Sequence, residues 1–465
     1  MSKPLDGRQR AKPPSGPVRE EPAGLQARRI ALEILLRVEV DHAFADVLLG
    51  HRLAELNRPA DRGLATQLVL GTLAWQRRLD YELARLSSRK LTELDPRVRA
   101  ILRMGLHQLR QLTRIPAHAA VDTAVRLAGE TRRRNGARGF VNAILRAAAR
   151  SPAPMPDRAR DEMGYLAVTH SHPRWLVKKF VDWFGVAEAE TIMAANNLTA
   201  PNVLRLNLRR GAADELAARL GRDAIVISRG GLFPETLIVD RTASVDCDSF
   251  RAGLFAQQAE ASQLVARLLA PPPGAIVIDC AAAPGGKSTH LAELVGPDGR
   301  VVALDLNLAG LKQTRGIAAR LQHDHVHVAR CDSSQSLPIR QRSVSYVLLD
   351  APCTGLGTLR EHPEIRWRLA PHDFTRMAHL QRAMLEQAAT LLTPNGILVY
   401  AVCSLAPEEG AGVVNDFLAQ HSEFVIDRPS ASPLSELIDA NGFLRTRPDR
   451  AARDAFFAAR LRRLA

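Results

Sequence analysis

The sequence predicts a multidomain protein with three parts: an all-α N-terminal domain, a small α+β module, and an α/β domain with a parallel, doubly wound sheet. Three observations predict this division. Apolar residues first recur at helical spacing, helix and strand patterns then mix, and short apolar runs finally alternate with amphipathic helices. A chain of 465 residues is long enough for several domains, each with its own core.

The chain is strongly basic, with 63 Lys and Arg against 49 acidic residues and a pI near 10.3. This balance favours a polyanionic partner, nucleic acid first, although a merely basic enzyme fits about as well. The five cysteines form no Cys-x-x-Cys pair, so no disulfide framework and no metal site is expected, and a reducing cytoplasm fits. No 18-residue apolar run and no secretory N-terminus occurs, so we expect a cytoplasmic protein without membrane contact.

The N-terminal region divides into a tail and a helical domain. Residues 1–24 are rich in proline and charge and lack an apolar period, so a disordered basic tail is expected. Residues 25–150 predict six or seven helices, in which residues such as Ile30 and Ile34 mark an apolar face. Asp95-Pro96 predicts a helix start, with a capping acid followed by a proline at the first helical position.

The remainder is a linker over 151–160, an α+β module over 161–245 and a βα-repeat domain over 246–465. Strands of the module are expected at 203–207, 224–228 and 237–239. Strands of the last domain are expected at 276–280, 301–306, 326–329, 344–349 and 397–402, with one more, antiparallel and at or near the sheet edge, in the C-terminal tail. Its helices are expected at 257–269, 288–294, 308–321 and 378–392.

The first strand of the last domain ends at Asp279 and leads into the small-residue loop Cys280-Ala-Ala-Ala-Pro-Gly-Gly-Lys287. Small residues allow a ligand to approach the backbone, and the helix that follows offers free N–H groups. A Walker loop would need glycine at Ala281, and no Gly-x-Gly-x-x-Gly is present. S-adenosylmethionine remains, because it has no phosphate and needs a close-approach loop with carboxylates for its ribose.

Acids end the next two strands. Asp305 can accept hydrogen bonds from both ribose hydroxyls, and Asp332 can meet the adenine amine. Either acid alone could be a cap or a turn residue. Their order along three successive strands favours the methyl donor.

Two later strands are each followed by a cysteine, Cys353 after Asp350-Ala-Pro and Cys403 after the strand at 397–402. Carboxyl ends of such strands form the ligand crevice of an open α/β sheet. Carbon 5 of cytosine is a poor nucleophile until a thiolate adds to carbon 6, so a methyltransferase that acts there needs a thiol. The base must leave its stack to enter, and Asp350 is the candidate acid near N3. Structural burial is the alternative for both cysteines, and either could be the nucleophile.

Three long motifs resemble those of the Nol1/Nop2/Sun family of RNA cytosine-5 methyltransferases. The stretches 115–128 and 139–146 resemble a NusB-like helical RNA-binding domain, and the combination, over nearly all of residues 25–465, resembles members that act on 16S ribosomal RNA. The resemblance implies a Rossmann-like catalytic domain, S-adenosyl-L-methionine as cofactor, 16S ribosomal RNA as partner, and a monomer. The motifs are Asp279-Cys-Ala-Ala-Ala-Pro-Gly-Gly-Lys287, Asp350-Ala-Pro-Cys-Thr-Gly-Leu-Gly-Thr-Leu-Arg-Glu-His-Pro-Glu-Ile-Arg-Trp367 and Tyr400-Ala-Val-Cys-Ser-Leu-Ala-Pro-Glu-Glu409.

Residue by residue, the resemblance implies that Cys403 attacks the base and that Cys353 assists product release. Asp350 and Pro352 would line the target base, and Lys287 would point into the same site. The donor-binding residues that it implies are Ala281, Ala282, Ala283, Pro284, Gly285, Gly286, Lys287, Asp305, Asp332 and Asp350.

The chain departs from the family pattern at four positions. Ala281 stands where cysteine is common, Ala259 for aspartate, Gly410 for asparagine and Ala455 for glycine. Two other functions remain open: the same chemistry on transfer RNA, or a non-catalytic RNA-binding or assembly protein of NusB type. The second would predict loss of Cys403 or of the donor loop, and both are present.

Overall fold

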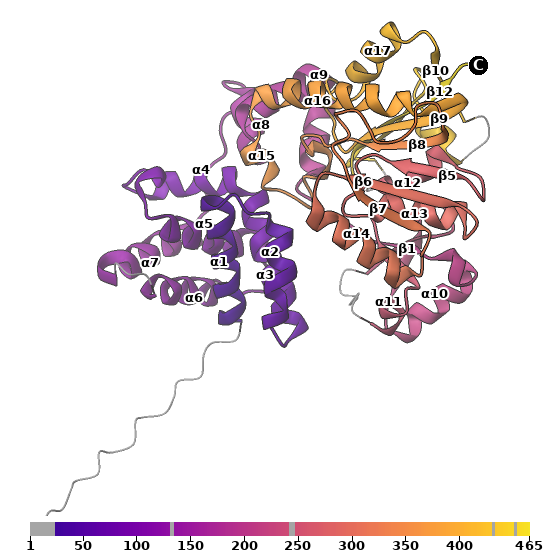
Figure 1. The fold of residues 1–465 in the computed structure, drawn as a ribbon. Coiled ribbons are helices and arrows are strands. Elements are labelled where there is room, and N and C mark those ends of the chain that lie inside the picture. The colour runs from indigo at the N-terminus through magenta and orange to yellow at the C-terminus, as the bar shows by residue number, and fades with distance from the viewer. Residues whose placement is uncertain (1–23, 131–133, 241–246, 430–432, 451–452) are drawn as a thin grey trace, which may run out of the picture.

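The computed structural model describes residues 24–130, 134–240, 247–429, 433–450 and 453–465 (Figure 1). The N-terminal tail predicted for residues 1–24 lies outside the described part except for Gly24, which directly precedes the first helix. The three predicted parts are present: a helical domain, a module with a small antiparallel sheet, and a large mixed sheet covered by helices. No helix in the described ranges is long and apolar enough to cross a membrane.

Seven α-helices surround one aliphatic core in the described part of residues 25–150, in agreement with the predicted number. Ile30 and Ile34 lie in that core. The predicted start at Asp95-Pro96 is confirmed, because the Asp95 carboxylate accepts a hydrogen bond of 2.8 Å from the backbone N–H of Arg97. The helices are α1 (Leu25–Val40), α2 (Ala45–Arg52), α3 (Pro59–Ala74), α4 (Gln76–Leu86), α5 (Pro96–Gln111), α6 (Ala117–Gly129) and α7 (Arg134–Arg150).

The middle module carries an antiparallel sheet in the order β2-β3-β1-β4. The strand predicted at 224–228 begins later, at Ile227, because Ala224 has a φ of 58° in the turn after a helix. β4 lies beyond the boundary predicted at 245 and occupies Gln257, where a helix was predicted to begin. The elements are α8 (Glu162–Thr169), α9 (Arg174–Ala195), β1 (Asn202–Leu206), α10 (Ala213–Arg222), β2 (Ile227–Gly230), β3 (Thr236–Val239), α11 (Asp248–Arg251) and β4 (Phe255–Gln257).

The C-terminal sheet has the strand order β10-β12-β9-β8-β5-β6-β7, with β11 paired to β12. β5 to β9 are parallel, and β12 is antiparallel and one position inside the edge strand β10, as predicted for the tail. The strands are β5 (Ile276–Asp279), β6 (Arg300–Asp305), β7 (Val326–Arg330), β8 (Val344–Asp350), β9 (Leu392–Val402), β10 (Phe424–Ile426), β11 (Phe443–Thr446) and β12 (Phe456–Arg463).

Helices cover both faces of this sheet because successive side chains of a buried strand point to opposite faces. In β8, Val347 and Leu349 pack with α16 and α17, whereas Leu348 packs with α12 and α13. This places the core in two layers and leaves the carboxyl ends of the strands free for loops. The helices are α12 (Glu260–Leu269), α13 (Gly286–Val295), α14 (Leu308–Leu321), α15 (Ile365–Arg368), α16 (Pro371–Thr390) and α17 (Ala411–Gln420).

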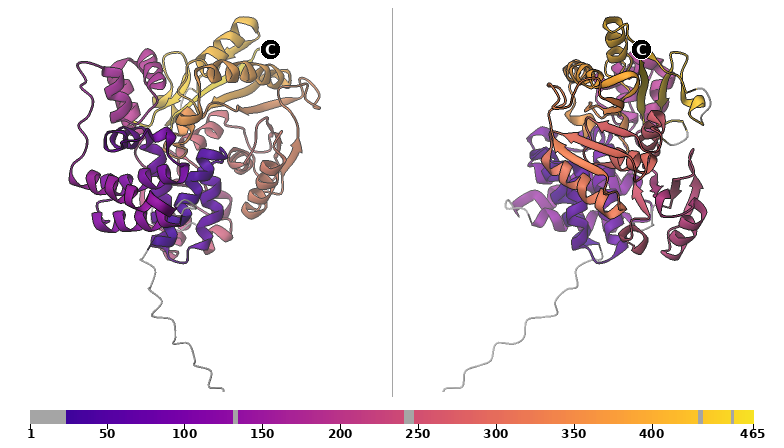
Figure 2. Two further views of the ribbon diagram at one scale, coloured as in Figure 1. Left: turned by 90° about the vertical axis from the view of Figure 1, so that its left-hand side faces the viewer. Right: turned by 45° about the vertical axis from the view of Figure 1, so that its right-hand side comes forward.

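The chain between β8 and α16 joins the three parts, and Figure 1 shows α15 between the N-terminal helices and α8. The buried guanidinium of Arg366 donates hydrogen bonds to the Asn197 side chain (2.7 Å) and to the Ser171 carbonyl (3.3 Å). Trp367 donates its indole N–H to the Leu73 carbonyl of α3 at 2.7 Å. In both views of Figure 2 the C-terminus lies at the end of the molecule away from the N-terminal helices.

Candidate active site

A cavity of about 590 Å³ opens at the carboxyl ends of the parallel strands. Loops after β5, β6, β7, β8 and β9 all contribute to its walls, as expected for the ligand crevice of an open α/β sheet. Its lining residues are Cys280, Ala281, Ala283, Asp305, Leu306, Asn307, Cys331, Asp332, Ser333, Ser334, Asp350, Ala351, Pro352, Cys353, Leu380, Met384 and Cys403.

The two predicted thiols meet in this cavity. β8 and β9 are neighbours with Asp350 opposite Ala401, so the loops that follow them begin side by side. The Sγ atoms of Cys353 and Cys403 are 3.2 Å apart, and both cysteines are free. The hydrogen bond to Cys403, together with burial, holds the pKa of Cys353 well above its usual value. Cys353 is therefore a neutral thiol at pH 7 that can share its proton with Cys403.

Lys287 and Asp350 form an ion pair beside the thiols, with 2.5 Å between Nζ and Oδ2. Lys287 also lies over the ring of Phe456, 5.0 Å from its centre. Burial alone would lower the pKa of Lys287, but the Asp350 carboxylate raises it overall, and Cys403 contributes in the same direction. Lys287 therefore keeps its positive charge, which interacts favourably with negative charge on Cys403.

The opposite side of the cavity carries the two predicted ribose- and adenine-binding acids. Asp305 accepts hydrogen bonds from the backbone N–H of Ala283 (2.9 Å) and of Asn307 (2.7 Å), so it also braces the donor loop. Asp332 accepts bonds from the hydroxyl (2.7 Å) and N–H (3.0 Å) of Ser334, which lower its pKa. Asp332 is therefore an ionised acceptor at pH 7, and both acids lie in the wall of the cavity.

Hydrogen-bonded carboxylates keep unused lone pairs, so each can still accept from a ligand. Asp332 is exposed, which leaves its second oxygen open to the cavity. These two loops therefore present acceptors to a ligand without rearrangement.

Only part of the predicted donor loop faces the cavity. Ala281 and Ala283 line it, whereas Ala282 is buried behind the loop and Pro284 is exposed. Gly285 has a φ of 109°, and a Cβ there would lie 2.8 Å from atoms of Thr314, so its role is to let the loop turn against α14. Gly286 begins α13, and its carbonyl accepts a hydrogen bond of 2.7 Å from the buried Arg205 of β1.

Asp279 lies beneath the donor loop and is fully buried. One of its oxygens accepts a hydrogen bond of 2.6 Å from the Ser288 hydroxyl, and the other has no partner. Burial raises the pKa of Asp279 to about 7. Because Asp279 ends a strand, as Asp305 does, a place in the cavity wall could be expected for it. Its side chain instead points into the protein and supports α13 through Ser288.

Glu409 is a residue of the site that the sequence analysis did not select. Its buried carboxylate accepts hydrogen bonds from the N–H and hydroxyl of Thr354 (2.8 and 2.5 Å), from the Ser404 hydroxyl (2.5 Å) and from the Gln381 amide (3.2 Å). It thus ties the residue after Cys353 to the residue after Cys403. The only sequence signal for it is the pair Glu408-Glu409 at the end of the motif after Cys403, and the sequence does not show which of the two carboxylates is buried.

Gly357 fixes the spacing of the same two loops. Its N–H donates to the Cys403 carbonyl (2.9 Å), and its own carbonyl accepts from the N–H of Ala455 (3.1 Å). A Cβ at Gly357 would lie 2.1 Å from the Ala455 oxygen and 2.9 Å from the Cys403 oxygen. No side chain fits between these backbones, so the glycine is needed for the close approach.

Family models match three segments of the chain. The model described as 16S rRNA methyltransferase RsmB/F matches residues 266–462, the NusB family matches 25–150, and the RsmF/B-like ferredoxin-like domain matches 172–246. The last match and the antiparallel sheet identify the middle module as ferredoxin-like.

Whole-length relatives agree. The ribosomal RNA small subunit methyltransferase B of Pseudomonas putida is 35% identical over 83% of this chain and 89% of its own length. The protein of the same name from Pasteurella multocida is 30% identical over 96% of this chain and 98% of its own. The crystal structure of PH0851 superposes with a TM-score of 0.79 at 26% identity, covering 96% of this chain and 99% of that one. The chain belongs to the RsmB/F family of 16S rRNA methyltransferases.

Proposed function

We propose that this protein transfers a methyl group from S-adenosyl-L-methionine to carbon 5 of a cytosine in 16S ribosomal RNA, through a covalent adduct with Cys403. The observation that carries the proposal is the pair of sulfurs 3.2 Å apart in one cavity with Asp350, whose carboxylate is paired with Lys287. A methyltransferase that acts on oxygen or on an exocyclic nitrogen has no need of two adjacent thiols.

The cavity fits the cofactor. Its volume of about 590 Å³ lies within the usual range for ligand pockets, and its polar wall is made of acceptors, Asp305 and Asp332, with the small side chains of Ala281 and Ala283 between them. Asp305 would accept from the ribose hydroxyls and Asp332 from the adenine amine. When bound, the cofactor supplies an electrophilic methyl group.

The nucleophile is the thiolate of Cys403, which forms when the thiol gives its proton to solvent. Its sulfur bonds to carbon 6 of the cytosine, and the displaced electron pair makes carbon 5 nucleophilic, so that carbon 5 can take the methyl group. The ammonium of Lys287 stabilises the thiolate. As the adduct forms, N3 takes a proton from solvent. Asp350, in the cavity wall, accepts hydrogen bonds from the protonated N3 and from the cytosine amino group, and Pro352 packs against the ring.

Release follows from the second thiol. Carbon 5 of the adduct loses its proton to solvent, the double bond between carbons 5 and 6 re-forms as the bond between carbon 6 and Cys403 breaks, and N3 returns its proton to solvent. Cys353, which is neutral at pH 7, donates its hydrogen to the departing thiolate across 3.2 Å. The order of roles, with Cys403 as nucleophile, rests on the resemblance to the Nol1/Nop2/Sun family.

The RNA substrate is supported by three features: the net charge of +14, the NusB and ferredoxin-like segments, and the names of the relatives. The target cytosine must leave its stack to reach sulfurs that line a cavity. The test uses unmethylated 16S ribosomal RNA and labelled donor. We expect label in 5-methylcytosine at one nucleotide, and none with Cys403→Ala; methylation of transfer RNA alone, or at another atom of the base, would contradict the proposal.

A further inference from the structure

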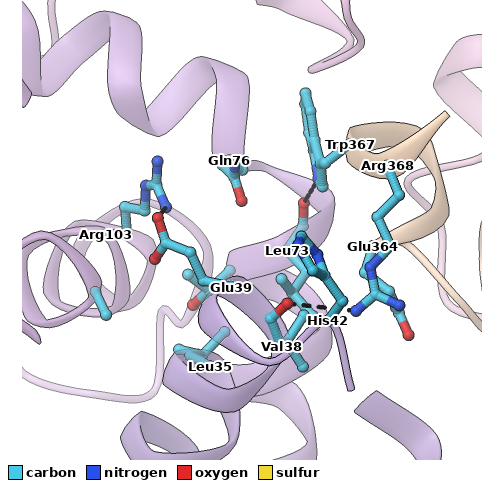
Figure 3. A pocket seen from close by; sticks show the side chains of 12 residues that line it. Leu35, Val38, Glu39, His42, Leu73, Gln76, Arg103, Glu364, Trp367 and Arg368 are labelled. Atoms are coloured by element: carbon cyan, nitrogen blue, oxygen red, sulfur yellow. Dashed lines mark hydrogen bonds and ion pairs between the residues drawn. The ribbon is translucent and has the colours of Figure 1, made fainter. Parts of the chain in front are cut away.

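A second pocket, of about 530 Å³, lies between the N-terminal domain and the segment Glu364–Arg368. This segment begins more than ten residues after Cys353. Helices α1, α3 and α5 form its floor and walls, and Trp367 and Arg368 of α15 close one side (Figure 3). Its lining residues are Leu35, Val38, Glu39, His42, Thr72, Leu73, Gln76, Ala100, Arg103, Glu364, Trp367 and Arg368.

Most charged groups of this pocket already have partners, but one carboxylate oxygen of Glu364 is buried without a hydrogen-bond partner. Glu39 forms ion pairs with Arg99 (2.7 Å) and Arg103 (3.4 Å), and Arg103 also pairs with Asp80 (2.7 Å). Arg368 donates to the backbone carbonyl of Ala43 at 2.5 Å. Arg103 is thus already paired, whereas the free oxygen of Glu364 can still accept a hydrogen bond, so the pocket suits a ligand with hydrogen-bond donors, such as the amino group of a base, rather than an anion.

Neutral polar groups are left without partners. The hydroxyl of Thr72 is buried, with 2% of the residue exposed, and has no hydrogen-bond partner. Figure 3 shows the amide of Gln76 directed into the space between Glu39 and Trp367, and among the described residues that amide has no hydrogen bond. A buried hydroxyl without a partner costs free energy that a ligand with polar edges recovers.

The other walls include aliphatic side chains and one aromatic ring. Leu35, Val38 and Ala100 supply aliphatic surface. The indole N–H of Trp367 is held by the Leu73 carbonyl at 2.7 Å, so the orientation of its ring is fixed. A fixed aromatic ring beside free amide and hydroxyl groups is how proteins hold an unstacked base of single-stranded RNA.

We propose that this pocket binds one base of the RNA substrate, a base other than the target cytosine. This inference rests on the proposed function, which makes RNA the substrate. Trp367 and Cys353 belong to the same stretch between β8 and α16, and Trp367 is fixed to α3. A base held against Trp367 therefore sets the position of the RNA relative to Cys353 and Cys403.

The test compares variants that change one polar group each. Thr72→Val removes the hydroxyl at nearly constant volume, and Gln76→Leu removes the amide. Thr169→Val and Gln420→Leu are the matched controls: the Thr169 hydroxyl is also buried without a partner, Gln420 is exposed, and neither lines the pocket. Affinity for unmethylated 16S ribosomal RNA is measured without donor, and KM for RNA and kcat are measured with it.

We expect Thr72→Val and Gln76→Leu to raise the Kd and KM for RNA roughly 5- to 30-fold, the effect of about 1–2 kcal/mol for one hydrogen bond, with kcat unchanged at saturating RNA. The controls should change Kd less than about twofold. Because Thr72→Val removes an unsatisfied buried group, its melting temperature should not fall, which separates lost binding from lost folding. An unchanged Kd in both pocket variants, with melting temperatures retained, would overturn the inference.

A third arm uses free nucleoside monophosphates. If they bind with an affinity that the pocket variants reduce while RNA affinity stays constant, the pocket serves a free nucleotide and the assignment to RNA is wrong. Failure of the proposed function has a different signature: the wild-type protein would then transfer no methyl group to cytosine carbon 5, while the Kd comparison, made without donor, would still give its answer.

Discussion

The sulfurs of Cys353 and Cys403 lie 3.2 Å apart although fifty residues separate them in the chain. The contact arises because β8 and β9 are adjacent and parallel, so the loops that follow both strands begin at the same end of the sheet. The two thiols share a cavity, but their surroundings differ. Cys353 keeps its proton because of its bond to Cys403 and its burial, whereas Cys403 lies near the Lys287 ammonium.

This asymmetry predicts opposite outcomes for the two alanine variants. With 16S ribosomal RNA and donor, Cys353→Ala should accumulate a covalent protein–RNA adduct, because attack proceeds and release does not. Cys403→Ala should form no adduct and transfer no methyl group. A denaturing gel with labelled RNA measures both. Cys247→Ala, at a buried cysteine outside the cavity, is the control and should turn over normally. An adduct in the absence of Cys403 would contradict the assignment of the nucleophile.

Gly357→Ala should disrupt the site from within the backbone. The added Cβ would lie 2.1 Å from the Ala455 oxygen and 2.9 Å from the Cys403 oxygen, so the loops must separate. We expect a loss of about 2 kcal/mol or more in the free energy of unfolding, and a fall in kcat as Cys403 moves. Gly316→Ala, on α14 with nothing within 4 Å of the new Cβ, should be neutral or slightly stabilising. Equal stability of the two variants in denaturant titration would refute this interpretation.

Glu409→Ala should separate the two cysteine loops. It would leave four buried donors, on Thr354, Ser404 and Gln381, without their acceptor. Each unmet donor costs about 1–3 kcal/mol before relaxation, so a total loss of about 3 kcal/mol or more is expected, together with reduced methyl transfer. Glu408→Ala is the neighbouring control: its ion pair with Lys179 is about one-third exposed on both sides, and its removal should cost at most about 1 kcal/mol. Thermal melts that rank the two variants in the opposite order would disprove the role of Glu409.

Asp279 predicts a specific pH dependence of stability. Its pKa in the folded protein is about 7, above the ordinary 3.8, so between these values the folded state holds a proton that the unfolded state has lost. Its contribution to stability is therefore full below pH 4 and declines as the pH rises to 7, by about 1.4 kcal/mol per pH unit and at most about 4 kcal/mol in all.

Asp279→Asn should remove this decline, because asparagine cannot ionise and can still accept from Ser288. The difference in free energy of unfolding between variant and wild type should therefore grow in favour of the variant from pH 5 to pH 8. Asp298→Asn, at an exposed position, provides the reference curve. A difference that stays constant with pH would show that Asp279 is ionised in the folded protein.

The sequence by itself determined the architecture and the chemistry on offer. The pattern changes along the chain from helical periodicity to short apolar runs that alternate with amphipathic helices, and this change predicted the α/β domain. Such patterns can be recognised in the sequence because they are local. The family could likewise be recognised from the sequence, since each of the motifs around Asp279, Cys353 and Cys403 is a continuous stretch of the chain. The site roles carried over from that resemblance stay predictions until the variants above are measured.

Tertiary structure decided what depends on contacts between distant segments. The short strand β4 reads as a helix start because three residues carry little pattern, and only pairing with β1 makes it a strand. The burial of Glu409 rather than Glu408, and the need for glycine at position 357, come from backbones that meet only in the folded chain. Long-range packing also built the pocket against Trp367, because its walls come from segments almost 300 residues apart, at Leu73 and Trp367.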